Sequence, residues 1–172
     1  MKTRQITFLG LMLAVVIVLS AVESLFLPLP FLPPHVRPGL SNIVVMYCVF
    51  CVGRGQAVCL NAAKSLFVLL TRGPMAGLLS LCGGMLSLAV IVLLLKLFDG
   101  EGVGQKMSYA TVSIAGAIAH NLGQFATVMV LLSTPAMVYF LPVLIISGII
   151  AGLLTGTLLK ILMPALAKLR RN

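Results

Sequence analysis

The segment "IAGAIAHNLGQFATVMVLL", residues 114 to 132, is apolar over its whole length except near its middle. There an imidazole, His120, and two amides, Asn121 and Gln124, stand among Ala, Gly and Val. A run of this length and apolarity is what one helix needs to cross a bilayer. Because polar side chains are costly inside a bilayer and tend to mark function, the segment predicts a membrane helix that carries a polar cluster.

The composition of the whole chain identifies the solvent that this segment meets. Of the 172 residues, 60% are hydrophobic and 9% are charged, and the mean hydropathy is +1.18. Soluble domains carry about 25% charged residues, so the composition excludes an ordinary soluble domain. We therefore expect an all-α integral membrane protein with one transmembrane domain over residues 1–172.

Six stretches are candidate membrane spans. They cover residues 6–26, 40–53, 57–72, 75–98, 110–133 and 136–163. Segments rich in Gly, Pro or charge separate them, among them "PLPFLPPHVRPG" and "DGEGVGQKMSY". The second and third spans are short, and a re-entrant pair is the alternative for them. The sequence thus predicts a bundle of six transmembrane helices.

The basic residues predict the orientation of this bundle, because cytoplasmic loops of membrane proteins collect Lys and Arg. With the amino terminus inside, two basic residues, Arg37 and Arg72, lie outside. Eight lie on the cytoplasmic side: Lys2, Arg4, Arg54, Lys96, Lys106, Lys168, Arg170 and Arg171. Both termini are therefore expected to be cytoplasmic. The net charge of +9 then reflects topology and contact with phospholipid, and nucleic-acid binding is not expected.

The amino-terminal segment has the basic start of a secretory signal peptide. Its apolar run of about 17 residues is longer than the usual 7 to 15, and no clean small-x-small cleavage site follows. We therefore expect the first span to be retained in the protein.

The four cysteines all lie in predicted spans, and Cys48 and Cys51 form a CxxC pair. No His or second Cys pair completes a zinc set, so we interpret these cysteines as small buried apolar residues. Neither a metal nor a cofactor is expected.

Small residues spaced by four lie on one helix face and let membrane helices pack closely. Such rows are Gly148, Gly152 and Gly156 in the sixth span and Ala115, Ala119 and Gly123 in the fifth. We expect these two rows to pack inside the bundle. The first span has Gly10 and Ala14, a candidate docking surface for a partner protein, with internal packing as the alternative.

Several polar residues of the predicted spans lie at similar depth, in the outer half of the bundle. Lys64 is near the middle of the third span, too far from either end to snorkel easily, and Glu23 is near the outer end of the first. His120 and Gln124 share a helix face, and Asn121 is turned from it by about 100°. Asn42 opens the second span, and the alternative is that Ser41 or Asn42 simply caps this helix.

Two interpretations of this cluster stay open. In one, Glu23 and Lys64 form a buried salt bridge and the amides join neighbouring helices. In the other, which we favour, the cluster lines a ligand cavity beneath a lid formed by residues 28–39. The chain has only three acids, so a proton or sodium relay has few members, and a small anionic or polar ligand suits Lys64, His120 and Arg72 better. The candidate binding residues are Glu23, Asn42, Lys64, His120, Asn121 and Gln124.

Four stretches carry a resemblance to a known family: "VESLFLPLPFLPPHVRPGLSNIV", "NAAKSLF", "AHNLGQ" and "TPAMVYFLPVLIISGIIAGLLTG". In this order and spacing they resemble the Gx transporter family, also labelled heptaprenyl diphosphate synthase component I. That family is similar to the S components of energy-coupling factor (ECF) transporters. The resemblance implies a six-helix subunit of a bacterial cytoplasmic membrane that binds a vitamin-like or precursor molecule near the outer face. It also implies docking on a transmembrane T subunit driven by two ATPases.

Two absences bear on this expectation. The chain has no GxxxxGK[ST] phosphate loop, so any ATP hydrolysis must come from partners. Prenyl elongation needs aspartate-rich segments for magnesium and diphosphate, and the single aspartate is Asp99, in a predicted cytoplasmic loop. We therefore expect no enzymatic activity. A membrane scaffold or accessory subunit of a prenyl or quinone pathway is the alternative function, and a stand-alone carrier or enzyme is a third.

Cysteine labelling checks the predicted topology. With the native cysteines replaced, Thr3→Cys and Arg170→Cys should react only from the cytoplasmic side, and His35→Cys should react from outside, because basic residues hold both termini inside. Labelling of Arg170→Cys from outside would contradict the six-span arrangement.

Overall fold

A computed structural model describes residues 3–25, 40–98, 108–132 and 135–171 of the chain. Its helices are α1 (Thr3–Leu25), α2 (Asn42–Cys51), α3 (Arg54–Arg72), α4 (Pro74–Leu97), α5 (Tyr109–Leu132) and α6 (Leu141–Arg171), with the short 3₁₀ helix η1 (Pro135–Phe140) before α6. All secondary structure in the described residues is helical. The all-α prediction is confirmed for this part of the chain.

Four helices of the described segments, α1, α4, α5 and α6, are long and apolar enough to cross a membrane. The chain is therefore a helical membrane protein. All six predicted spans correspond to helices, but α2 has 10 residues and α3 does not have the apolarity of a span. Passage of α2 and α3 through the bilayer, and the side on which the termini lie, stay predictions.

The helix α3 is less apolar than the other long helices because it carries several polar side chains, and in the structure these face the inside of the bundle. Asn61, Lys64 and Ser65 are buried, whereas Leu66 and Leu70 are 57% and 75% exposed. In water this arrangement would be unfavourable, because apolar side chains would face the solvent and polar groups would lose their hydration. In lipid the same arrangement is favourable, because the outer face meets hydrocarbon while Lys64 and Ser65 make hydrogen bonds inside the protein.

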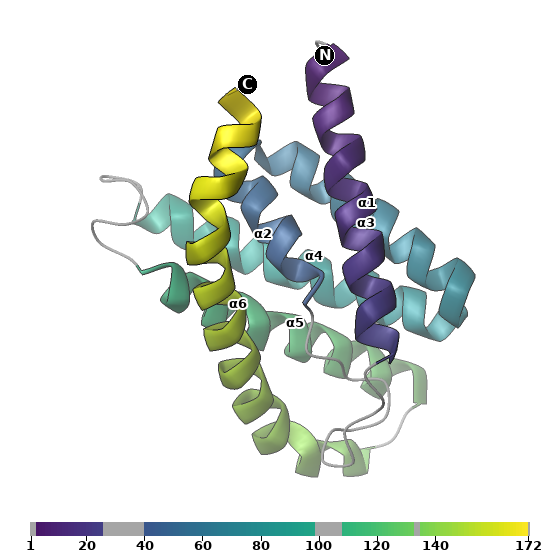
Figure 1. The fold of residues 1–172 in the computed structure, drawn as a ribbon. Coiled ribbons are helices and arrows are strands. Elements are labelled where there is room, and N and C mark those ends of the chain that lie inside the picture. The colour runs from purple at the N-terminus through teal and green to yellow at the C-terminus, as the bar shows by residue number, and fades with distance from the viewer. Residues whose placement is uncertain (1–2, 26–39, 99–107, 133–134, 172) are drawn as a thin grey trace.

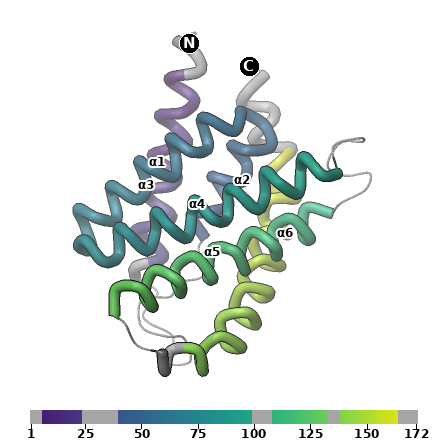
Figure 2. Tube along the Cα trace, turned by 180° about the vertical axis from the view of Figure 1, so that it is seen from behind, coloured from purple at the N-terminus to yellow at the C-terminus, as the bar shows by residue number. Residues whose placement is uncertain are grey.

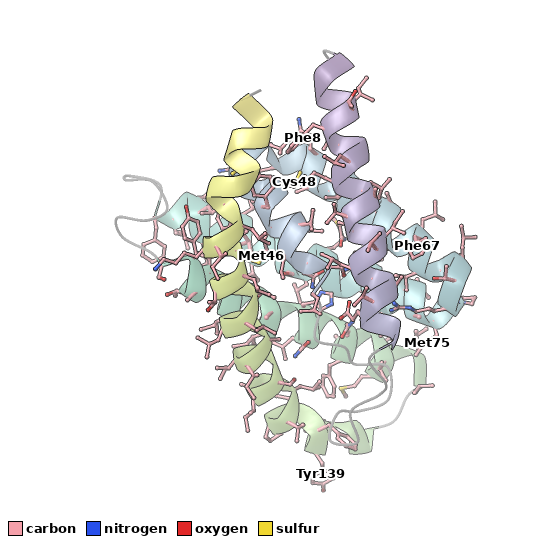
Figure 3. The ribbon with its side chains drawn as sticks, viewed as in Figure 1. Phe8, Met46, Cys48, Phe67, Met75 and Tyr139 are labelled. Carbon is pink, nitrogen blue, oxygen red and sulfur yellow. The ribbon has the colours of Figure 1, made fainter. Side chains whose placement is uncertain are left out.

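The short helix α2 is surrounded by other helices. Its residues from Ile43 to Val49 are all buried, and it contacts α1, α3, α4 and α6. Figure 3 shows Met46 and Cys48 of this helix between α1 and α6. A helix that is apolar all round belongs in a core, and α2 takes that place here. Of the four cysteines predicted to be buried, Cys48 is buried, Cys51 and Cys82 are half-buried, and Cys59 is exposed on α3.

The helices form two layers. Figure 2 shows α3, α4 and α5 side by side, with α4 in the middle. On the other face α1 and α6 run across this layer, and α2 lies between them (Figure 1). The start of α1 and the end of α6 lie at the same end of the molecule (Figure 1). This placement of the two ends is the one that an even number of crossings gives.

Single glycines make the sharp reversals between α2, α3 and α4. Gly53 has φ of 152° and Gly73 has φ of 92°, in the region where a side chain is strained. Pro74 follows Gly73 as the first residue of α4, a position where its missing N–H costs nothing. One residue therefore suffices to connect α3 to α4 as antiparallel neighbours.

The glycine row of α6 faces the backbone of α5. A Cβ atom on Gly156 would lie 2.8 Å from Cα of Ala110, and one on Gly148 would lie 3.1 Å from Cα of Ile118. At Gly152, between them, an added Cβ would overlap the backbone of Ile114. The two helices thus approach so closely that a methyl group does not fit without a shift of the backbone.

We predict that Gly152→Ala lowers the melting temperature of the purified protein, because the new methyl group meets backbone that cannot move aside. Overpacking of this kind costs about 1 to 3 kcal/mol. Gly10→Ala is the matched control, since a Cβ on Gly10 meets nothing within 4 Å and alanine favours the helix. Equal melting temperatures for the two variants would contradict the close α5–α6 packing.

Candidate functional site

A cavity of about 270 Å³ lies between α1, α3, α4 and α5. It is lined by Ser20, Glu23, Lys64, Val68, Arg72, Ala76, Leu79, Ser80, His120 and Gln124. The lining residues of α1 and α3 come from the second half of each helix, and those of α4 come from its first half. The cavity therefore lies toward the end of the bundle that is opposite the two termini.

The wall formed by α1 and α3 carries the charges of the cavity. Glu23 and Lys64 are 5% and 4% exposed, so both need partners inside the protein. The Lys64 ammonium donates a hydrogen bond of 2.6 Å to Oδ1 of Asn42 on α2. The hydroxyl of Ser41 donates to a carboxylate oxygen of Glu23 at 3.4 Å. The beginning of α2 thus orients both charged groups.

Arg72 joins the end of α3 to α1. Its guanidinium donates to the backbone carbonyl of Ser20, and the hydroxyl of Ser20 lies 3.4 Å from the same nitrogen. Arg72 is half-buried and lines the cavity together with Glu23 and Lys64. The site therefore brings together two cationic side chains and one carboxylate.

The opposite wall, on α5, consists of neutral polar side chains. His120 and Gln124 are 4% and 6% exposed and lie against Gly83 of α4. A Cβ on Gly83 would be 2.8 Å from Cγ of Gln124 and 3.0 Å from Cε1 of His120, so only glycine leaves room for this approach. Nδ1 of His120 and Oε1 of Gln124 are buried, and neither atom makes a hydrogen bond within the described residues. Each such group carries a desolvation cost that a bound polar group would relieve.

Asn121 faces another direction and joins α5 to α6. Its amide nitrogen donates to the carbonyl of Leu144 at 2.9 Å and to the hydroxyl of Ser147 at 3.1 Å. Asn121 and Asn42 border a separate space of about 10 Å³, which His120 also touches. Buried amides that hold neighbouring membrane helices together are common, and this role fits Asn121.

The structure therefore brings four of the six candidate binding residues to one cavity: Glu23, Lys64, His120 and Gln124. Asn42 reaches the site through its bond to Lys64, and Asn121 lies behind it. Ser41, the N-cap of α2, makes no capping bond with its side chain, so the capping interpretation has no support. The predicted lid, residues 28–39, lies outside the described residues. Binding itself stays a prediction for all six.

Two polar lining residues, Ser20 and Ser80, were not anticipated from the sequence. Serine hydroxyls in apolar helices often bond to the backbone of their own helix, so a lone serine gives little signal. In the structure the hydroxyl of Ser80 instead accepts a hydrogen bond of 3.2 Å from Ser65. Contacts between helices, which periodicity does not show, decide these roles.

The family described as heptaprenyl diphosphate synthase component I matches residues 12–162, most of the chain and all of the cavity lining. No curated protein and no solved structure matches the chain.

The different surroundings of the two amides of α5 give a prediction. Asn121→Leu should lower the melting temperature, because it removes the bonds to α6 and leaves the Leu144 carbonyl unpaired, at a cost of about 1 to 3 kcal/mol. Gln124→Leu should leave the melting temperature of the ligand-free protein unchanged or raise it, because it replaces an unsatisfied buried oxygen with apolar surface. Thermal unfolding in detergent measures both. Equal losses would show that the two amides are both structural.

Proposed function

The chain belongs to the heptaprenyl diphosphate synthase component I family, and on that premise we propose that it is the substrate-binding S component of an ECF importer. It captures a small vitamin-like molecule, or an isoprenoid or quinone precursor, at the outer face of the bacterial cytoplasmic membrane. It then docks on a transmembrane T subunit that two ATPase subunits drive. The single observation that carries this proposal is the polar cavity between α1, α3, α4 and α5.

The cavity favours a binding role over a purely structural one. A structural polar cluster inside a membrane is expected to satisfy its own hydrogen bonds, as Asn121 does with α6. His120 and Gln124 line open space instead, and each keeps a buried polar atom without a partner among the described residues. Perturbed or unsatisfied polar groups that converge on a concave site are the usual mark of a ligand site.

The outer surface of α1 supports the docking part of the proposal. Gly10 and Ala14 are both exposed, and a Cβ on Gly10 would meet no atom within 4 Å. These residues therefore do not contribute to close packing within the described bundle, unlike the glycines of α6. Small residues on an exposed face of a membrane helix allow a partner helix to approach closely.

An accessory subunit of a prenyl diphosphate or quinone pathway is the second candidate function. The family name favours it, because "component I" implies a second component. The cavity of 270 Å³ is small for a chain of seven isoprene units, since pockets for drug-sized ligands already measure about 300 to 1,000 Å³. With a single aspartate in the sequence, Asp99, we propose no catalytic step for the chain itself.

Copurification from the native membrane tests the proposal. The wild-type protein should bring down a T subunit and two ATPases, and the double variant Gly10→Leu with Ala14→Leu should lose them, because the larger side chains keep the partner helix away. The melting temperature of the double variant should equal that of the wild type, because both positions are exposed.

The matched control is the pair Ala62→Leu and Ala89→Leu, two exposed alanines on α3 and α4 that should retain the partners. Unchanged copurification of the Gly10 and Ala14 variant would reject these residues as the docking surface. Recovery of a prenyl synthase subunit in place of the ATPases would support the accessory role instead.

A further inference from the structure

The walls of the cavity differ in charge. Lys64 and Arg72 each carry one positive charge and Glu23 carries one negative charge, so the described lining residues hold one excess positive charge when His120 is counted as neutral. An excess charge in low-dielectric surroundings is costly, and a ligand with one negative charge would balance it. The bonds from Lys64 to Asn42 and from Arg72 to Ser20 hold the two cations in place beforehand.

The wall on α5 selects for a different chemical group. Oε1 of Gln124 is an acceptor only, so an N–H or O–H group of a ligand is what satisfies it. Nδ1 of His120 either donates or accepts, depending on the tautomer, and adjusts to its neighbour. The ligand therefore gains most when it presents a hydrogen-bond donor to α5.

Apolar residues and the size of the cavity limit the rest of the ligand. Besides the charged groups, the α5 side chains and the hydroxyls of Ser20 and Ser80, the lining is apolar, made by Val68, Ala76 and Leu79. The volume of about 270 Å³ is at the low end for ligand pockets. The space therefore suits a compact apolar body, such as one ring, and not a polyprenyl chain.

From these three features we propose that the cavity takes a small organic monoanion that carries an N–H or O–H donor at the end opposite its acidic group. The acidic group lies against Lys64 and Arg72, and the donor lies against Gln124 and His120. Gln124 is then a specificity-determining residue, which the close approach at Gly83 holds in position. This inference rests on the proposed function only in treating the cavity as a ligand site.

Four probes separate the required features in the purified wild-type protein. 4-Aminobenzoate has both the negative charge and the donor, benzoate lacks the donor, 4-aminobenzamide lacks the charge, and dimethylallyl diphosphate is a multiply charged isoprenoid. Affinities are measured by ligand-observed NMR and by calorimetry in detergent. 4-Aminobenzoate should bind about 5- to 150-fold more tightly than benzoate or 4-aminobenzamide, the effect of one buried hydrogen bond or charge contact.

Two variants assign the preferences to the walls. Gln124→Leu should remove the preference for 4-aminobenzoate over benzoate and keep the preference for carboxylate over carboxamide. Lys64→Met should remove the preference for carboxylate over carboxamide and keep the preference for 4-aminobenzoate over benzoate. Thr127→Val is the matched control on α5, because the Thr127 hydroxyl bonds to the Gly123 carbonyl of its own helix, and both preferences should survive. Should Lys64→Met fail to fold, the wild-type ranking and Gln124→Leu still decide.

The proposal is overturned if benzoate, 4-aminobenzamide or dimethylallyl diphosphate binds as tightly as 4-aminobenzoate. It is also overturned if no probe binds at about 10 mM, where even a poorly efficient ligand of about ten heavy atoms is detectable. Copurification of ATPases is independent of these results. If the probes bind in the expected order but no ATPases copurify, the proposed ligand class stands and the importer function is rejected. If ATPases copurify but the probes bind in a different order, the importer function stands and the proposed ligand class is rejected.

Discussion

The polar interior depends on one constraint, that each buried charge needs a partner, and the hydrogen bond of 2.6 Å from the Lys64 ammonium to Asn42 Oδ1 meets it for Lys64. A charge placed inside a membrane protein needs partners from other helices, because water and the lipid cannot supply them there. This bond ties α3 to α2, Ser41 ties α2 to Glu23 of α1, and Arg72 ties α3 back to α1. The three contacts form a closed set, and the charged wall of the cavity is its inner surface.

The polar residues of α5 divide into two groups with different costs. Asn121 satisfies its amide nitrogen on α6 and strengthens the contact between two helices whose backbones already touch at the glycine row. His120 and Gln124 each leave one buried atom unsatisfied within the described residues, at the edge of open space. Binding sites commonly carry such a loss of stability, because the group that would relieve it is the ligand. The adjacent residues His120 and Asn121 thus have different surroundings, although they are neighbours in one helix.

In the proposed importer α1 connects two functions. Its first half presents Gly10 and Ala14 outward, and its last turns contribute Ser20 and Glu23 to the cavity. A rigid helix that carries a docking face at one end and cavity residues at the other can couple occupancy of the cavity to the contact with a partner. The contacts of α1 with α2 and α3 would transmit this coupling, since they hold the charged wall.

The sequence by itself determined the class of protein and the position of its helices. The composition required a membrane protein, and the apolar runs located six helices. Their bounds were right to within a few residues, except that α6 begins at Leu141 and continues to Arg171. The spacing placed His120 and Gln124 on one face and aligned the glycines of α6. Tertiary structure alone decided that α3 turns its polar face inward and that α2 is surrounded by other helices. It also decided that Asn121 faces α6 and that Arg72 reaches Ser20. The physical reason is that helical periodicity fixes which residues share a face, whereas the neighbour of that face depends on how all six helices pack at once.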